Sequence, residues 1–317
     1  MKDRFGREIE YLRLSVTERC NLRCRYCMPA EGICKKRHDD MLTEDEMILA
    51  VNTAASLGIR KVRITGGEPL VKKNILSICQ RIGQISGIEE LCLTTNGLLL
   101  PQYARALKEA GVKRINLSLD TLREDRYRHI TRCGDLSSAL EGLEAALSAG
   151  FEKVKINSVL IGGFNQDEVE ALASLTLRYP VDVRFIELMP MQKSDEFDVN
   201  AFLPAKYVTE ALPQLEKLPL DGKDVLLYRL PGGLGNVGLI SPLSQHFCGK
   251  CDRLRLTADG HLKPCLHSSQ EISIKGLNET EMRERFIEAI QAKPACHGAL
   301  SAYDRSEAGR NMNRIGG

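Results

Sequence analysis

The sequence predicts an α/β fold in which repeated βα units build a parallel sheet, followed by a C-terminal extension that is organised differently. Between residue 11 and about residue 190, six short β-rich runs alternate with helical patterns, an order typical of βα units. After residue 190 the alternation stops, and polar and glycine-rich segments follow. The alternation alone is compatible both with a β/α barrel and with an open, doubly wound sheet.

The six expected strands are short runs rich in β-branched and other apolar residues. They are YLRLSV (11–16), KVRIT (61–65), ELCLTT (90–95), KRINLSL (113–119), KVKINSVL (153–160) and DVRFIEL (182–188). Between the strands, Thr43 and Glu46 predict a capping box at the start of a helix that Gly58 ends. Another helix is expected over residues 136–150, where leucines and alanines recur at helical spacing before Gly150.

We expect two parts, with the βα units in residues 1–190 and the extension in residues 191–317. Within the extension, residues 191–205 are polar and irregular, and the glycine-rich residues 231–252 are expected to form loops. Residues 304–315 are basic and poor in apolar side chains, which indicates a tail and not a core helix.

Composition and charge exclude several classes of protein. The 317 residues carry a net charge of +2 and a sequence pI of about 8.0, whereas a nucleic-acid-binding face usually brings a pI above roughly 9. No apolar run approaches the roughly 18 residues that a membrane span needs. The first ten residues mix both charges, unlike a signal or transit peptide. We therefore expect a cytoplasmic protein that binds neither nucleic acid nor a membrane.

Eleven cysteines are the most informative part of the composition. In a cytoplasmic chain they do not indicate a disulfide framework. Six of them form two groups of three. The other five are expected to be small buried hydrophobic residues with no assigned role: Cys34, Cys79, Cys92, Cys133 and Cys296.

The first group, Cys20, Cys24 and Cys27, has the spacing C-x3-C-x2-C directly after the first expected strand. Closely spaced thiolates select zinc, Cu(I) or iron–sulfur clusters. Structural zinc normally has four protein ligands, and Cys34 and His38 lie too far along the chain to supply the fourth. A [4Fe–4S] cluster on three thiolates keeps one iron open for a ligand, and we favour this interpretation.

The second group consists of Cys248, Cys251 and Cys265. Its spacing also fits a structural zinc knuckle, completed by His267, His246 or Cys296. Two arginines, Arg253 and Arg255, follow at alternating positions, so that on a strand both side chains point to one face. Paired guanidiniums suit phosphate oxygens, which favours a site for a phosphorylated ligand beside the metal centre.

The first group, with Tyr26 just before its last cysteine and ITGGEP (64–69) at the end of the second expected strand, resembles the radical S-adenosylmethionine (SAM) superfamily. The resemblance implies a partial (β/α)6 barrel of radical SAM type, in which the C-terminal extension carries a second iron–sulfur cluster. The residues implied to contact SAM are Tyr26, Gly67, Ser118 and Met189. Read alone, the glycines suggest a turn, and Ser118 and Met189 suggest packing.

The resemblance extends through RFIELMP (184–190) and CDRLRLTADGHLKPCL (251–266) to the final Gly316-Gly317. With these motifs, the sequence is similar to the branch of the superfamily that acts on GTP in the first step of molybdenum-cofactor biosynthesis. The resemblance implies two [4Fe–4S] clusters, on Cys20, Cys24 and Cys27 and on Cys248, Cys251 and Cys265. The residues implied to bind GTP are Arg13, Arg63, Thr94, Lys155, Arg253, Leu254 and Arg255. Those implied to act in catalysis are Arg13, Gly316 and Gly317.

The resemblance further implies that the 5′-deoxyadenosyl radical from SAM abstracts the 3′ hydrogen of GTP and that C3′ then attacks C8 of guanine. An external electron donor is implied, and a product that passes to cyclic pyranopterin monophosphate synthase. The oligomeric state is left open, with a homodimer as one option. Two alternatives remain: a radical enzyme that acts on a peptide, and an electron carrier or cluster-dependent regulator.

Overall fold

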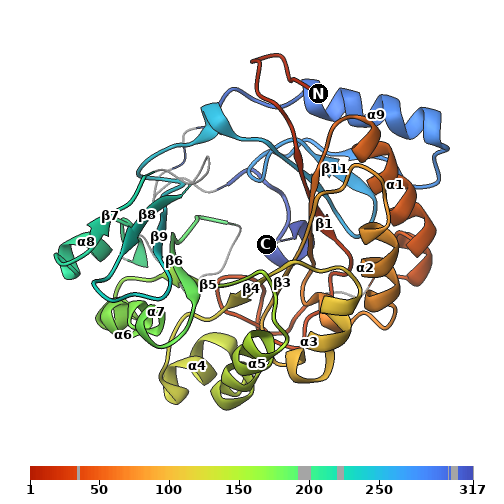
Figure 1. Cartoon of the computed structure of the whole chain (residues 1–317). Coiled ribbons are helices and arrows are strands. Elements are labelled where there is room, and N and C mark those ends of the chain that lie inside the picture. Colours follow the sequence, from red (N-terminus) through yellow and green to blue (C-terminus); the bar gives the residue numbers. More distant parts are fainter. Residues whose placement is uncertain (34–35, 192–200, 220–224, 299, 301–305, 317) are drawn as a thin grey trace.

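The computed structural model describes residues 1–33, 36–191, 201–219, 225–298, 300 and 306–316. Figure 1 shows a curved sheet with helices along its outer side. The strands form one twelve-stranded sheet in the order β12-β11-β10-β1-β2-β3-β4-β5-β6-β9-β8-β7. In the described part of the chain, β7 and β12 do not pair with each other, so the sheet is a partial barrel.

The six central strands are parallel and follow chain order. Their bounds lie within one residue of those expected from the sequence. They are β1 (Tyr11–Ser15), β2 (Lys61–Thr65), β3 (Glu90–Thr95), β4 (Arg114–Ser118), β5 (Lys153–Leu160) and β6 (Val181–Glu187).

Strands from the C-terminal part extend this sheet at both edges. Strand β9 pairs with β6, and β10 pairs with β1, both in parallel. The C-terminal strands are β7 (Glu216–Lys217), β8 (Leu226–Arg229), β9 (Val237–Ile240), β10 (Arg253–Leu256), β11 (His261–Lys263) and β12 (Ile272–Ser273). The two parts of the chain therefore share one sheet.

Helices cover the outer face of the sheet. They are α1 (Glu44–Ser56), α2 (Ile75–Gly83), α3 (Leu100–Glu109), α4 (Glu124–Thr131), α5 (Leu136–Ser148), α6 (Val169–Ala173), α7 (Leu175–Arg178), α8 (Tyr207–Ala211) and α9 (Glu279–Gln291). A further short helix, α10 (Met312–Ile315), lies on the inner side instead. Short 3₁₀ turns are η1 (His38–Asp40), η2 (Pro69–Val71), η3 (Gln166–Glu168) and η5 (Cys248–Lys250). None of the described helices combines the length and apolar character needed to cross a membrane.

The predicted capping box at the start of α1 is confirmed. Thr43 Oγ1 accepts a hydrogen bond from the Glu46 amide at 3.2 Å, and Glu46 Oε2 accepts one from the Thr43 amide at 2.8 Å. The helix ends just before Gly58, whose φ of +94° lies in the region that favours glycine. The expected helix over residues 136–150 is α5, which Asp135 caps by accepting from the Ser138 amide.

Alternation along the strands separates the core from the interior of the curve. On β1, Leu12 and Leu14 are fully buried in the core beneath the helices. The intervening Tyr11 and Arg13 line a cavity on the inner side. Because the same alternation continues in the neighbouring strands, the polar inward positions meet in one place.

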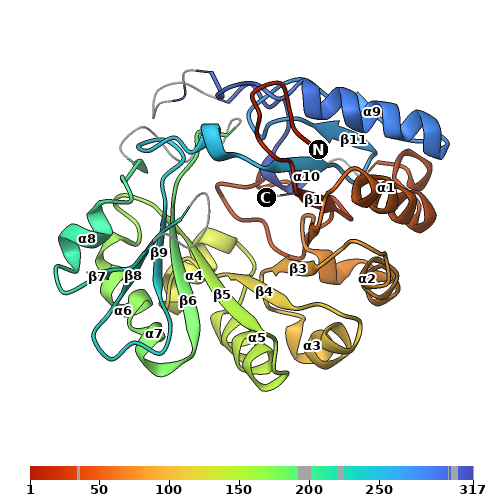
Figure 2. The same ribbon diagram turned by 45° about the horizontal axis from the view of Figure 1, so that its top comes forward.

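Two expectations for the C-terminal part were wrong. Residues 231–252 are not all loop, because Val237–Ile240 form β9. Its Gly238 fits against the Arg184 side chain, where a Cβ would lie 3.1 Å from Arg184 Cγ. The tail also ends in the one-turn helix α10, in which Ile315 is fully buried. Figures 1 and 2 place α10 inside the curve of the sheet. Of the expected irregular segment 191–205, residues 192–200 lie outside the described residues.

Candidate functional site

A cavity of about 390 Å³ lies inside the curve of the sheet. Inward-facing side chains of β1 to β6 and of β10 line it, together with both cysteine groups and part of α10. The six cysteines, far apart in the sequence, therefore face one cavity. The predicted site residues that line it are Arg13, Cys20, Cys24, Tyr26, Cys27, Arg63, Gly67, Thr94, Ser118, Lys155, Met189, Cys248, Cys251, Arg253, Arg255 and Cys265.

Three predicted residues are placed differently. The side chain of Leu254 points to the opposite face of β10 and is fully buried in the core. Gly316 reaches the site through its backbone, as described below. Gly317 lies outside the described residues.

The loop that carries the first cysteine group is held by the segment at the end of α4. The amides of Arg23 and Arg25 donate to the carbonyl oxygens of Thr131 and Ile130. Arg132 has a φ of +63°, and its guanidinium donates to the carbonyl oxygens of Arg23 and Met28 at 2.6 and 3.1 Å. A non-glycine residue in this region is strained, and here the strained residue holds the cysteine loop through these hydrogen bonds.

Burial raises the pKa of the Cys20 thiol to about 11 and that of Cys27 to about 12. Such thiols need a cation to hold them as thiolates, because a metal deprotonates a coordinating thiol. Three soft donors that face one cavity fit an iron–sulfur cluster that keeps one position open. The site therefore fits the cluster that the sequence pattern implies.

The two glycines of ITGGEP allow the cysteine loop to pack against the end of β2. A Cβ on Gly66 would lie 2.6 Å from the Thr17 carbonyl oxygen, and one on Gly67 would lie 2.4 Å from that of Arg19. The Gly67 amide donates to the Thr17 carbonyl oxygen at 2.7 Å. In the described chain, what approaches these glycines is the backbone that leads into Cys20.

Two buried carboxyl groups flank the first cysteine group. Burial raises the pKa of Glu68 to about 7 although it accepts hydrogen bonds from the Asn96 amide and the Thr95 hydroxyl. Burial also raises the pKa of Asp120 to about 6, and this carboxyl accepts the Tyr26 hydroxyl at 2.7 Å. Glu68 thus fixes the C-terminal end of β3, and Asp120 fixes the Tyr26 ring.

The second cysteine group lies on loops that a buried lysine ties together. Lys293 Nζ donates to the carbonyl oxygens of Arg253 and Pro264 at 2.6 and 2.8 Å and contacts Cys251 Sγ at 3.8 Å. Cys265 follows Pro264 directly. An amino group is thus held beside the thiol of Cys251, where its positive charge would stabilise a thiolate.

Positive charge dominates the rest of the cavity. Eight lysine or arginine side chains line it, against the two carboxyls Glu68 and Asp120. Strand register sets Arg13 between Arg63 of β2 and Arg255 of β10. Because these guanidiniums face one enclosed space, the cavity is suited to a polyanion.

The pKa values of these side chains reflect their burial and their closeness to one another. Burial, followed by the charge of Arg184, lowers the pKa of Lys155 to about 7. Burial and the charge of Arg13 lower the pKa of Arg253 to about 9. Burial would raise the pKa of Tyr11, but the surrounding arginines lower it to about 8. A bound polyanion would offset both the burial of these cations and the repulsion between them.

Several polar atoms in the cavity have no hydrogen-bond partner within the described structure. They are buried and come from neighbouring strands. The atoms are Nε of Arg13, Arg114 and Arg184 and the side-chain oxygens of Asn116 and Asn157. Buried polar groups are normally paired, so these unpaired donors and acceptors point to a polar ligand.

Sequence reasoning missed Arg114, Arg184, Asn116, Asn157 and Tyr11. The signal that identifies them is the period of two along the parallel strands, since Asn116 and Asn157 lie in register with the predicted Lys155 and Ser118. Once Arg13 and Lys155 are assigned to the inner face, every second residue of the neighbouring strands belongs there as well.

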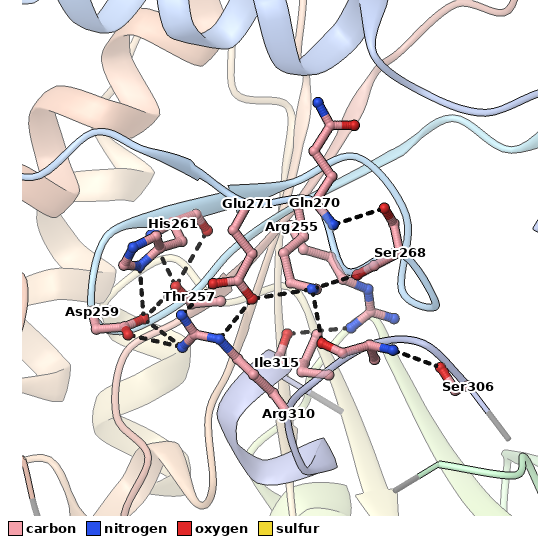
Figure 3. A network of polar contacts seen from close by, with 12 residues as sticks. Arg255, Thr257, Asp259, His261, Ser268, Gln270, Glu271, Ser306, Arg310 and Ile315 are labelled. Atoms are coloured by element: carbon pink, nitrogen blue, oxygen red, sulfur yellow. Dashed lines mark hydrogen bonds and ion pairs between the residues drawn. The ribbon is translucent and has the colours of Figure 1, made fainter.

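The C-terminal tail is fixed to the edge of the cavity by the polar network in Figure 3. Arg310 Nη1 donates to both carboxylate oxygens of Asp259 at 2.9 and 2.8 Å, and Arg310 Nε donates to Glu271 at 2.6 Å. Arg255 Nη1 donates to the Gly316 carbonyl oxygen at 2.5 Å. We call these contacts of Arg310 and Arg255 the tail clamp.

Of the scattered cysteines, Cys79 and Cys92 are buried, as expected. For Cys133 and Cys296 the expectation was wrong, because both are exposed. Cys133 lies beside the first cysteine loop, with its Sγ 3.5 Å from the Asn21 carbonyl oxygen. Cys296 lies beside the second group. Cys34 lies outside the described residues.

Comparison with known proteins shows which families the chain resembles. A family model described as the radical SAM superfamily matches residues 14–176, and one described as molybdenum cofactor synthesis C matches residues 181–299. The chain is 49% identical over 321 residues to the GTP 3′,8-cyclase of Alkaliphilus oremlandii and 48% identical over 329 residues to that of Pelotomaculum thermopropionicum. Both alignments cover all of this chain and all of the relative.

Two solved structures share the fold at low sequence identity. Streptococcus suis SuiB bound to S-adenosylmethionine matches with a TM-score of 0.62 at 15% identity, over 91% of this chain and 65% of SuiB. The protein anSMEcpe with bound AdoMet matches with a TM-score of 0.57 at 13% identity, over 92% of this chain and 79% of that protein. The predicted partial barrel of radical SAM type is thus confirmed.

Proposed function

The chain belongs to the GTP 3′,8-cyclase family within the radical SAM superfamily, and from this premise we propose that it converts GTP to (8S)-3′,8-cyclo-7,8-dihydroguanosine 5′-triphosphate, the first step of molybdenum-cofactor biosynthesis. The observation that carries the proposal is one cavity with six cysteines and eight cationic side chains. SAM and an iron–sulfur cluster belong to the superfamily. A second cluster and the individual contacts are parts of the proposal.

In the proposed arrangement, Cys20, Cys24 and Cys27 hold the first [4Fe–4S] cluster. When bound and reduced, this cluster and SAM would supply a 5′-deoxyadenosyl radical able to remove the 3′ hydrogen of GTP. C3′ would then bond to C8 of guanine, and one further electron from the external donor with one proton would complete the 7,8-dihydro product. Tyr26, Gly67, Ser118 and Met189 line the cavity where SAM would bind. The hydrogen bond from Tyr26 to Asp120 orients its ring toward that position.

Cys248, Cys251 and Cys265 hold the second cluster in this proposal, and the basic residues hold GTP. A nucleoside triphosphate carries about four negative charges, which convergent cations can balance in a desolvated site. Arg13, Arg63 and Arg255 adjoin one another on three neighbouring strands. Thr94 lies beside Arg63, whose Nη1 is 3.5 Å from its hydroxyl.

The tail completes the site. Arg13 and the terminal glycines are proposed to act near the reacting ribose. Gly316 has a φ of +77°, and a Cβ there would lie 2.4 Å from Thr65 Oγ1, so a residue without a side chain fits this position. For Leu254, whose side chain is in the core, only a backbone contact with GTP is proposed.

The proposal includes an external one-electron donor, transfer of the product to cyclic pyranopterin monophosphate synthase, and a cytoplasmic location. It also assigns residues 1–190 to the partial barrel of radical SAM type and residues 191–317 to an extension with the second cluster, a substrate-binding segment and the Gly316-Gly317 tail. This assignment is supported by the pairing of β10 with β1 and by lining residues from both parts in one cavity.

An anaerobic assay tests the proposal. The chain is reconstituted with iron and sulfide, reduced, and supplied with SAM and GTP that carries deuterium at C3′. We expect about eight irons per chain, deuterium in 5′-deoxyadenosine, and a cyclised purine triphosphate. Cys24→Ala should abolish 5′-deoxyadenosine, whereas Cys265→Ala should lose only the cyclised product. Unlabelled 5′-deoxyadenosine would exclude abstraction at C3′, and about four irons with bound zinc would exclude the second cluster.

A further inference from the structure

A second set of soft ligands lies beside the second cysteine group. The ligand atoms of Cys248, Cys296 and His297 all lie within 4.8 Å of one another. Cys248 begins η5, whereas Cys296 and His297 lie in the loop that follows α9. Two distant segments thus bring two thiols and an imidazole together, and Cys251 and Cys265 are not part of this set.

A buried arginine holds the two segments in this position. Arg7 Nη1 donates to the carbonyl oxygens of Cys248 and Ala295 at 2.7 and 3.2 Å, and its Nη2 donates to that of Pro294 at 2.7 Å. Asp3 fixes the guanidinium through a 2.6 Å contact with Nε. Because Arg7 is buried and bonded to both segments, the grouping is built into the fold.

The imidazole of His297 is oriented as a metal ligand. Its Nδ1 lies 2.9 Å from the Gly298 carbonyl oxygen. When Nδ1 donates its hydrogen to this oxygen, Nε2 carries the free lone pair, which is the usual outer-shell arrangement around a metal-binding histidine. The ring of His246 lies 4.7 Å from that of His297, and its Nδ1 is 3.0 Å from the Pro242 carbonyl oxygen. The Nε2 of His246 is therefore also free when its Nδ1 donates, although His246 is not part of the three-residue set.

We propose that Cys248, Cys296 and His297 form a mononuclear site for a soft divalent cation of the Zn²⁺ class in the chain that lacks the second cluster. Two thiolates and one or two imidazoles are a typical zinc ligand set. Ligands of one ion lie close together, because each is only about 2.0–2.3 Å from the metal. Ligands of different irons in a cluster are separated by the body of the cluster. The short mutual spacing therefore assigns Cys296 and His297 to the same ion as Cys248.

This inference rests on the proposed function at one point, since Cys248 is also a proposed ligand of the second cluster. One thiolate cannot serve both centres in these two geometries. Binding of Zn²⁺ replaces the thiol protons of Cys248 and Cys296 and removes Cys248 from the cluster site. Zinc and the second cluster are therefore mutually exclusive, and zinc blocks assembly of that cluster alone.

The site itself is tested on the cluster-free, full-length chain under anaerobic conditions, with Co²⁺ as the probe. We expect one equivalent to bind, with the visible bands of tetrahedral cobalt and a thiolate charge-transfer band. Cys296→Ser and His297→Ala should each weaken binding about tenfold or more, at least as much as loss of an outer-shell partner costs. Cys251→Ser is the matched control, and its affinity should equal that of the unmodified chain. Equal affinity in Cys296→Ser, or an octahedral spectrum, would overturn the proposal.

A competition experiment tests the consequence and separates the two proposals. Reconstitution with iron and sulfide in the presence of one equivalent of Zn²⁺ should lower the iron content from about eight to about four per chain. Cys296→Ser should keep about eight irons under the same conditions, because it weakens zinc binding; its side chain is exposed, so we expect the fold to be retained. If the unmodified chain never exceeds about four irons without zinc, the second cluster of the proposed function fails. In that case the cobalt titration still tests whether Cys248, Cys296 and His297 bind a divalent cation.

Discussion

Arg255 donates a hydrogen bond from Nη1 to the carbonyl oxygen of Gly316 at 2.5 Å, and so joins a cavity-lining strand to the end of the chain. The same side chain lies in register with Arg13 on β1. The tail is thus attached through its backbone to the basic side chains that line the cavity. A substitution that loosens the tail should therefore change the arrangement of these side chains, even where the substituted residue does not line the cavity.

The first prediction concerns Arg310, which holds the tail through Asp259 and Glu271. Burial would raise the pKa of Asp259, but its contacts with His261, Lys36, Thr257 and Arg310 hold it well below its usual range. Arg310→Ala should release the tail and lower kcat/KM about tenfold, since hydrogen bonds between charged groups contribute about 1.5–3 kcal/mol each.

The measurement combines turnover with trypsin cleavage after Arg314, which should become faster in Arg310→Ala while the iron content stays unchanged. Arg310→Lys keeps one ion pair and should recover part of the activity. Arg285→Ala removes an exposed contact with Glu288 on α9 and serves as the control. Normal turnover together with faster cleavage would show that the clamp has no part in the reaction.

The second prediction concerns pH. The pKa of Lys155 is lowered to about 7 by burial and by Arg184, so in the free protein its charge is lost as pH rises through about 7. A polyanion favours the charged form and raises this pKa in the complex. Binding of GTP should therefore take up a proton above pH 7, and affinity should fall as pH rises from 7 toward the pKa of the complex.

Calorimetry of GTP binding in two buffers of different ionisation enthalpy measures this uptake. Lys155→Met should abolish it. Lys153→Met is the matched control, because Lys153 lies on the same strand and pairs with the same Asp182 at 2.8 Å. Proton uptake that persists in Lys155→Met would assign the linkage to another group, such as Tyr11.

The third prediction tests a residue that sequence reasoning missed. Arg184 has a buried, unpartnered Nε in the cavity, and burial and Arg63 lower its pKa to about 10. Arg184→Ala should weaken GTP binding about tenfold or more, in line with the loss of one charge-assisted hydrogen bond. Arg178→Ala, on α7 at the outer side, is the control. Unchanged GTP affinity in Arg184→Ala would remove this residue from the substrate site.

The fourth prediction concerns Gly67. A Cβ at this position would lie 2.4 Å from the Arg19 carbonyl oxygen, so Gly67→Ala should displace the loop before Cys20. We expect iron to fall to about four per chain, with loss of 5′-deoxyadenosine formation, because only the first cluster is affected. Gly249→Ala, where a Cβ meets nothing within 4 Å, should retain all of its iron. Full iron content in Gly67→Ala would mean that the loop adjusts to the added methyl group.

The sequence predicted the βα frame almost to the residue, because strand and helix periodicities and the Thr43 cap are local signals. It did not predict β9, since a glycine-rich segment becomes a strand only by pairing with β6. The spacing of the cysteines predicted two ligand groups, and the resemblance to the family assigned Arg13 to the site. It missed Arg184 because the period of two shows which residues share a face only after a neighbouring strand has been aligned and its inner face assigned. The approach of Cys296 to Cys248 depends on Arg7, which belongs to neither segment.

The twelve-stranded order has a further consequence for how this chain can be divided. Strands β10 and β9 occupy the two sides of the six-stranded frame, and Cys248 and Cys251 lie on the stretch of chain that leads from one to the other. A fragment that ended at about residue 176 would expose the backbone donors and acceptors of β1 as an unprotected template for intermolecular pairing. A truncation that removes the second cysteine group therefore also uncovers the edge of the sheet, and the shortened chain should be prone to aggregate.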